Sequence, residues 1–166
     1  MVQRIQTFLL ALVAGLMLWF CFTNIWVNIN NKTAEKIIFT PIILTYYSAS
    51  LEGNDLTNLS MSESSNIYIV IVACISALLA IISIFNYQKR VRQLKIGFLN
   101  SALIVILIMV VYYQISEAKK VLAGANYEEE YKMGFFLPIL AFAVNVLANY
   151  YIKKDEDLVR SADRIR

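Results

Sequence analysis

The chain has 166 residues, of which 59% are hydrophobic and 16% are charged, and its net charge is +3. Soluble globular domains contain about 45–50% apolar residues, so this composition excludes an ordinary soluble domain and predicts a single membrane domain over residues 1–166. The sequence has no histidine, which argues against haem ligation and histidine-based metal sites, so we expect no cofactor and no metal.

Four runs without Asp, Glu, Lys or Arg predict four membrane-spanning helices, at residues 7–25, 67–87, 96–116 and 133–152. Each run has about 20 residues and, at a rise of about 1.5 Å per residue, can cross the ~30 Å hydrocarbon core of a bilayer. The predicted fold class is therefore an all-α membrane protein, a four-transmembrane-helix bundle. No nucleophile–base pair can be assembled within the runs, so the sequence does not predict an enzyme.

The connection between the first two runs, residues 26–66, is expected to be an outer loop with structure of its own. Residues 27–30 and 37–47 are rich in β-branched and aromatic side chains and predict a short β-ribbon, with Pro41 at an edge or bend. A segment lying flat among the lipid headgroups is the alternative. Residues 48–65 are rich in Ser, Asn, Glu and Gly and are interpreted as a mobile linker, after which Ser65 or Asn66 caps the second helix.

The second outer loop, residues 117–132, is expected to begin with an extra helical turn over residues 117–122 and to stop at Gly124. It continues with the acidic triplet Glu128, Glu129 and Glu130. Such a triplet can bind a cation, but solvation is the usual fate of a charge run, and we favour solvation.

The distribution of Lys and Arg predicts the orientation. Residues 1–6, the loop 88–95 and the tail 153–166 hold ten basic residues, whereas the two outer loops hold five, diluted by eight acidic residues. Because Lys and Arg are retained on the cytoplasmic side, we expect a multi-pass protein with both termini in the cytoplasm. An eight-residue basic loop between two spans offers no groove for nucleic acid, so we predict none as a partner.

Neutral polar residues within the runs form a candidate intramembrane polar face: Asn100, Gln114, Asn145 and Asn149. In lipid, helices associate through small residues and interhelical hydrogen bonds, so bundle packing is the favoured interpretation. The alternative is a polar substrate cavity near Asn145 and Asn149, beside a kink at Pro138.

The tail has apolar residues at helical spacing (Leu158, Val159, Ala162 and Ile165), which predicts a short amphipathic helix on the cytoplasmic surface. We expect it to lie across the cytoplasmic mouth of the bundle, with Asp163 among the basic residues of the two ends. The candidate interaction residues are Arg4, Arg160, Asp163, Arg164 and Arg166.

The opening MVQRIQT (residues 1–7) and the closing DLVRSADRIR (residues 157–166) resemble the ends of an uncharacterised family of small bacterial four-span membrane proteins, a domain of unknown function. The resemblance covers the whole chain. It implies a bacterial inner (cytoplasmic) membrane location, and it brings no activity, substrate or site residue.

Two functions compete. The first is a non-enzymatic structural or accessory subunit, which lies in the lipid bilayer and contacts a membrane-protein partner or another copy of itself. The alternative is a small carrier or lipid-handling protein that uses the polar cavity near Asn145 and Asn149.

Overall fold

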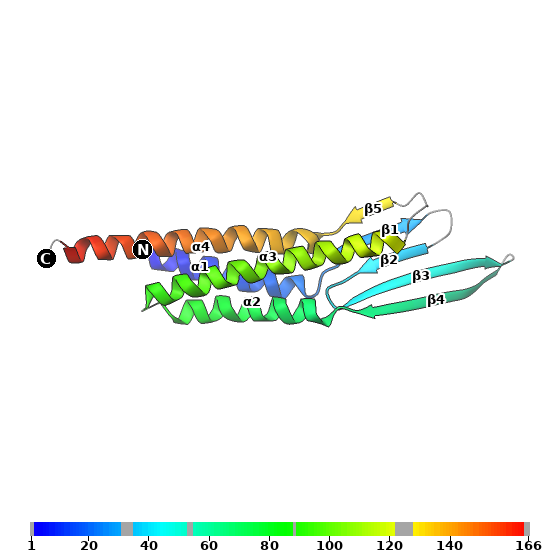
Figure 1. The fold of residues 1–166 in the computed structure, drawn as a ribbon, viewed down its shortest axis with the longest axis horizontal. Coiled ribbons are helices and arrows are strands. Elements are labelled where there is room, and N and C mark those ends of the chain that lie inside the picture. Colours follow the sequence, from blue (N-terminus) through cyan, green and yellow to red (C-terminus); the bar gives the residue numbers. More distant parts are fainter. Residues whose placement is uncertain (1, 31–34, 53–54, 88, 122–127, 165–166) are drawn as a thin grey trace.

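The structure, a computed structural model, describes residues 2–30, 35–52, 55–87, 89–121 and 128–164. In chain order the elements are α1 (Val2–Phe20), β1 (Trp26–Asn30), β2 (Glu35–Phe39), β3 (Ile43–Glu52), β4 (Asp55–Ser65), α2 (Ile67–Phe85), α3 (Arg90–Val121), β5 (Glu128–Tyr131) and α4 (Met133–Arg164). The helices lie side by side along the long axis and the strands occupy one end (Figure 1). Both chain termini lie at the opposite end.

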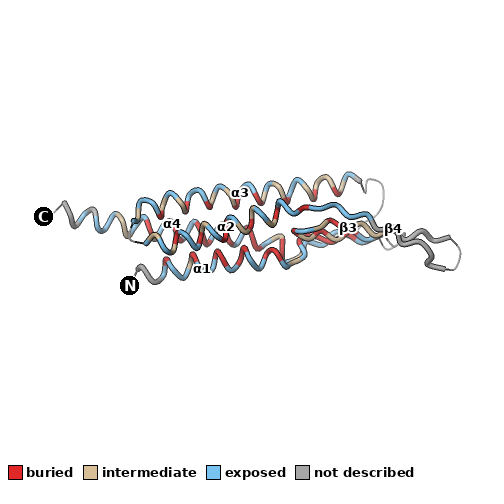
Figure 2. Tube along the Cα trace, turned by 90° about the horizontal axis from the view of Figure 1, so that it is seen from below, coloured by how far each residue is buried: buried red, intermediate tan, exposed pale blue. Residues whose placement is uncertain are grey.

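The helices pack so that α1 and α3 each contact both α2 and α4. Their buried residues face one another and their exposed residues face outward (Figure 2). The buried positions of α2 are mostly small, namely Ile69, Ala73, Ser76, Ala77, Ala80 and Ser83. Small side chains let helix backbones approach closely, which is how helices associate in an apolar solvent.

The strands form one antiparallel sheet in the order β4-β3-β2-β1-β5. The register pairs Phe39 with both Trp26 and Leu44, which places these three side chains on one face of the sheet. All three are buried, in the same apolar cluster as Ile115 and Ala118 near the end of α3. The last turns of α3 thus cover this face, and the sheet is attached to the bundle by a continuous core.

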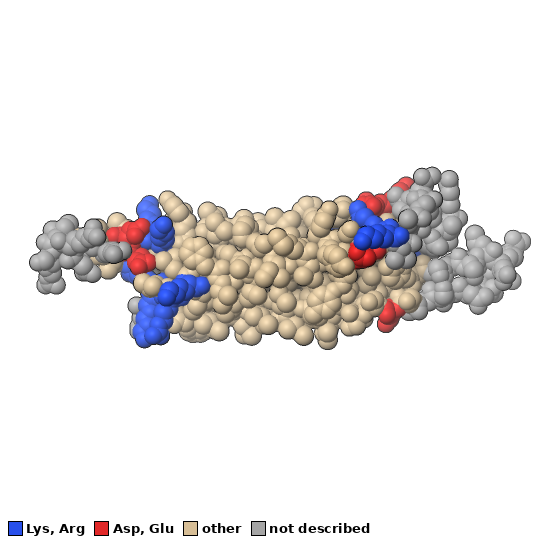
Figure 3. All heavy atoms as spheres, viewed as in Figure 1, with Lys and Arg blue, Asp and Glu red and all other residues tan. Residues whose placement is uncertain are grey.

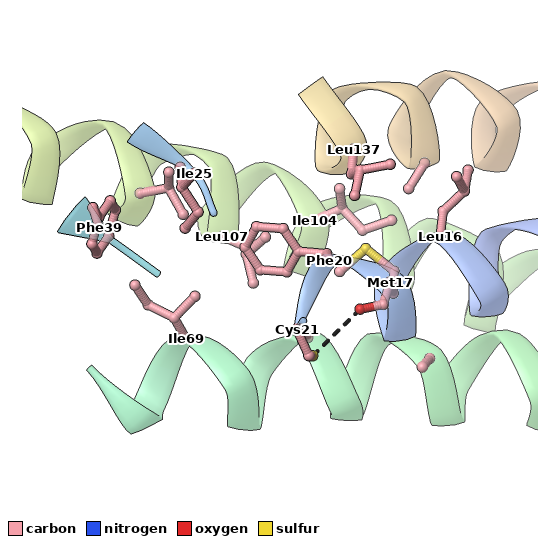
Figure 4. Packing of buried hydrophobic residues seen from close by; sticks show 14 of the residues in the cluster. Leu16, Met17, Phe20, Cys21, Ile25, Phe39, Ile69, Ile104, Leu107 and Leu137 are labelled. Carbon is pink, nitrogen blue, oxygen red and sulfur yellow. Dashed lines mark hydrogen bonds between the residues drawn. The ribbon is translucent and has the colours of Figure 1, made fainter. Parts of the chain in front are cut away.

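The core continues through the junction between the bundle and the sheet. Phe20 ends α1 and is fully buried, as is Ile25 just before β1. In the close view, Ile25, Phe39 and Ile69 gather at the sheet end, while Phe20 lies beside Leu107 (Figure 4). The junction is therefore packed with large side chains instead of being a linker.

The all-α fold class was wrong, because the first connection belongs largely to a five-stranded sheet. The predicted ribbon corresponds to β1, β2 and the start of β3, with Pro41 in the bend between β2 and β3. Residues 48–65, interpreted as a linker, contribute to β3 and β4 instead. These strands could not be predicted from their polar sequence, because β4 is an edge strand that is ordered by its pairing with β3 and has no apolar pattern of its own.

The four-transmembrane-helix bundle was also wrong as predicted. In the described residues, three helical stretches are long and apolar enough to cross a membrane: Ile67–Phe85, Arg90–Lys120 and Met133–Val159. The apolar stretch of α1, Ile5–Phe20, is shorter. The length of the first helix was overestimated, because α1 ends at Phe20 and the rest of the apolar run lies outside it. In that remainder, Cys21 and Ile25 are buried in the junction core.

The separate tail helix was wrong as well. α4 is one helix from Met133 to Arg164 and extends past the start of α1 instead of turning across the bundle (Figure 1). No Gly or Pro follows Ile152 in the chain, and the tail is rich in good helix formers, so nothing ends the helix at the expected boundary. By contrast, the extra turn expected after residue 116 is confirmed, because α3 continues to Val121. The stop expected at Gly124 lies outside the described residues.

Candidate functional site

Three helices are joined by a buried cluster of hydroxyl and amide groups. Ser76 Oγ of α2 donates a hydrogen bond to Asn100 Oδ1 of α3 at 2.7 Å, and Asn100 Nδ2 donates to Asn145 Oδ1 of α4 at 3.4 Å. Asn145 Nδ2 in turn donates to Ser101 Oγ at 2.8 Å and to the Gly97 carbonyl at 3.0 Å. Asn145 is completely buried and Asn100 nearly so. The cluster therefore links α2, α3 and α4 through hydrogen bonds between buried polar side chains.

Asn149 lies one turn further along α4 and closes the same cluster. Its Nδ2 donates to Ser101 Oγ at 3.4 Å, while its Oδ1 is buried without a hydrogen-bond partner. That oxygen packs on Gly97: a Cβ at position 97 would lie 1.8 Å from it. The glycine thus lets α3 and α4 approach closely at this point.

Gln114, the fourth member of the predicted polar face, is not part of this cluster. It lies at the sheet end, where its Nε2 donates to Asn66 Oδ1 at 3.1 Å and also contacts the Tyr68 hydroxyl. Tyr68 OH donates to the same Asn66 oxygen at 3.3 Å. Asn66 is the N-cap residue of α2, and it is one of the two residues that the sequence offered for this position. Its side chain makes no capping hydrogen bond. It connects α2 to α3 instead.

A groove of about 360 Å³ runs between α3 and α4 on the terminal half of the bundle. On each helix the lining residues recur at intervals of three or four positions and so lie on one face. The α3 wall consists of Leu94, Phe98 and Ser101, and the α4 wall consists of Phe142, Val146, Asn149, Tyr150 and Lys153. A second groove of about 480 Å³ shares Tyr150 and Lys153 with it and continues along α4 past Lys154, Asp157 and Leu158. Neither groove was predicted from the sequence, although the lining positions recur at helical spacing, at 94, 98 and 101 on α3 and at 142, 146, 149, 150 and 153 on α4.

Charged side chains are confined to the two ends of the helical part, and the visible face between them is uncharged (Figure 3). At the terminal end, Arg90 of α3 binds Asp155 of α4: Nη2 lies 3.2 Å from Oδ2, and Nη1 donates to the Asp155 carbonyl at 2.8 Å. At the sheet end, Lys119 pairs with Glu129 and donates to the Tyr131 hydroxyl.

The acidic triplet is thus partly neutralised, because Lys132 also pairs with Glu130 at 2.6 Å. Its three residues, together with Tyr131, form β5, which hydrogen-bonds to β1. In the described residues no group of three or more His, Cys, Asp or Glu side chains has an arrangement that could hold a metal ion.

For the candidate interaction residues at the chain ends, the described part of the chain gives backbone positions and no side-chain contacts. The backbone of Arg4 lies in α1, and those of Arg160, Asp163 and Arg164 lie in α4. Their side chains, and the whole of Arg166, are outside the described residues.

Three of the described helices are long enough to cross a membrane, and each of these helices contains an uncharged run. A five-stranded sheet lies at one end of the bundle. These features define a membrane protein with a sheet built onto a helical bundle. The chain belongs to the family described as a domain of unknown function (DUF4293), whose model matches residues 2–165. The resemblance to an uncharacterised family is thereby confirmed. No match is found among curated proteins.

Proposed function

We propose that this protein is a non-enzymatic accessory subunit of a membrane assembly, and that it holds a partner protein through the open edge of its sheet. The observation that carries the proposal is β4, an 11-residue strand that pairs with β3 on one side and forms the edge of the sheet on the other. An edge strand presents a row of unpaired N–H and C=O groups. A partner in extended conformation would add a sixth strand there, and the backbone hydrogen bonds would supply the affinity.

The ladder identifies which β4 amides face outward. The Asn66 N–H donates to the Ile42 carbonyl at 2.8 Å, and the register continues with Leu44 opposite Ser64 and Thr45 opposite Glu63. Because hydrogen-bonded and non-hydrogen-bonded pairs alternate in an antiparallel ladder, the Glu63 amide is directed away from β3. This amide is therefore one that a partner strand would use.

Replacement of Glu63 by proline is expected to abolish partner binding while leaving the sheet intact. Proline removes the outward N–H and is tolerated on edge strands, so β3–β4 pairing should survive. The measurement is affinity purification of the full chain from its own membranes in mild detergent, followed by quantification of each co-purifying protein.

The matched control is Glu63→Ala, which removes the carboxylate and keeps the amide, and it should retain the partner. Equal recovery of every co-purifying protein with Glu63→Pro and the unmodified chain would contradict edge pairing. Recovery of only a second copy of this chain would also contradict the proposal.

We further infer that the protein lies in the cytoplasmic membrane of a bacterium, with the end that carries both termini in the cytoplasm and the sheet on the other side. The family resemblance supports the bacterial membrane. The ten basic residues of the terminal end, against five at the sheet end, support the orientation. The orientation would place the β4 edge outside the cytoplasm, where its partner would have to be.

A membrane-impermeant maleimide is expected to label Ser62→Cys in intact cells with a permeabilised outer envelope, but not Ser161→Cys. Both serines are exposed, one on β4 and one on the distal part of α4. Each variant is made in a chain in which Cys21 and Cys74 are replaced by alanine, so that one thiol is present. Labelling of Ser161→Cys before the inner membrane is disrupted would reverse the orientation.

A further inference from the structure

We propose that the groove between α3 and α4 binds one anionic phospholipid, with an acyl chain along its apolar walls and the phosphate at Lys153 and Lys154. This inference concerns a different surface from the sheet edge and does not depend on the partner protein. Its support comes from the shape of the groove, the position of its polar end and the charge there.

The shape fits a single acyl chain. Phe142 and Lys153 mark the two ends of the α4 wall, and eleven residues of α-helix rise about 17 Å. Half of a ~30 Å hydrocarbon core is about 15 Å, so the groove is as long as one leaflet is deep. Phe98, Val146 and Leu94 supply most of the remaining apolar wall.

The polar end of the groove lies where a headgroup would be. Tyr150 lines both grooves, and tyrosine is enriched at the level where acyl chains give way to headgroups. Beyond it, Lys153 and Lys154 are exposed, and in the described part of the chain neither has a salt-bridge partner. They are therefore free to bind a phosphate.

The charge balance selects an anionic lipid. Two lysines and one carboxylate, Asp157, line the second groove, which leaves a net charge of about +1 at neutral pH. The nearby pair of Arg90 and Asp155 is already satisfied internally. A basic residue near an anionic membrane surface contributes about 1 kcal/mol, which corresponds to about a fivefold change in affinity per lysine.

The test uses the purified full chain, stripped of lipid by detergent exchange and incubated with phosphatidylglycerol or phosphatidylcholine of identical acyl chains. Native mass spectrometry counts the lipids retained at increasing collision energy. We expect one phosphatidylglycerol per chain, retained about fivefold more than phosphatidylcholine, as the net charge of about +1 in the groove predicts. Lys153→Gln with Lys154→Gln should abolish this preference.

Two further variants separate the groove from general charge. Lys89→Gln with Lys95→Gln removes two exposed lysines outside the groove, and it should leave the preference unchanged. Val146→Trp fills the groove from a half-exposed position and should abolish retention of both lipids, with circular dichroism reporting the fold. Equal retention of the two lipids, loss of preference in the Lys89 and Lys95 variant, or unchanged retention in Val146→Trp would each overturn the proposal.

Discussion

Replacement of Trp26 by alanine is expected to lower the free energy of unfolding by about 3–5 kcal/mol, as for other buried large aromatic residues. Trp26 is completely buried in the cluster that joins the sheet to the bundle, and it pairs with Phe39 on β2 and with Tyr131 on β5. Its loss leaves a cavity at this junction and should loosen the sheet before the helices. Thermal unfolding in detergent by circular dichroism, together with proteolysis of the sheet, measures both effects.

Two controls isolate the packing effect. Ile29→Ala on the same strand removes a side chain that is 38% exposed, and it should cost about 1 kcal/mol or less. Trp26→Phe keeps a ring and removes the indole N–H, which is buried without a partner, so it should cost much less than Trp26→Ala. If Ile29→Ala were as destabilising as Trp26→Ala, strand propensity and not core packing would govern the sheet.

Replacement of Gly97 by alanine is expected to destabilise the bundle by about 2 kcal/mol, although alanine favours helices. The new Cβ would lie 1.8 Å from Asn149 Oδ1 and 2.7 Å from its Cγ. Asn149 is buried and hydrogen-bonded to Ser101, so moving its side chain away from the new Cβ would break that hydrogen bond. Overpacking of this kind costs about 3 kcal/mol at its upper range, against about 1 kcal/mol gained in helix propensity.

The matched control is Gly15→Ala on α1, where an added Cβ meets nothing within 4 Å. That change should be neutral or stabilising by up to about 1 kcal/mol. Combining Gly97→Ala with Asn149→Ala removes the clash, and the pair should cost less than the sum of the two single changes. Additive costs in this cycle would show that the two residues do not interact.

The helices could be predicted from the sequence because an uncharged stretch has few alternatives to a buried or membrane-embedded helix. What the sequence did not reveal was where such a stretch stops being helical. Residues 21–25 carry no charge, and two of them, Cys21 and Ile25, are apolar because they are buried in the junction core, where a membrane would favour the same side chains. Hydropathy cannot separate these two causes.

The sheet was underestimated for a different reason. β1 pairs with β5, about 100 residues later in the chain, and β3 pairs with the largely polar β4. Neither pairing leaves a local pattern, because the order of an exposed strand depends on its neighbours. Only β1, β2 and the start of β3 carried enough alternation and β-branched residues to be anticipated.

Among the polar residues, the sequence identified Asn100, Asn145 and Asn149, which belong to one cluster: Asn100 donates to Asn145, and Asn145 and Asn149 both donate to Ser101. The role of Ser101 and of Gly97 could not be anticipated, because it depends on which faces of α3 and α4 meet. Gln114 shares the chemistry of the cluster but lies at the other end of the bundle, beside Asn66. The spacing of polar residues along each helix therefore indicated candidates for the buried cluster. Which of them belong to the cluster depends on how the helices pack against one another.

The length of α4 has a mechanical consequence. Its 32 residues make a rod of about 48 Å. One residue, Lys132, separates it from β5, and the rings of Tyr131 and Phe135 are in contact across this connection. Pro138 interrupts the hydrogen-bond ladder only in the first two turns, so most of the rod is continuous. A tilt of about 5° at the sheet would move the far tip by about 4 Å, given that length. The segment of α4 beyond Ile152 extends past the start of α1 (Figure 1), so it is the part of the helix that any such tilt would displace most.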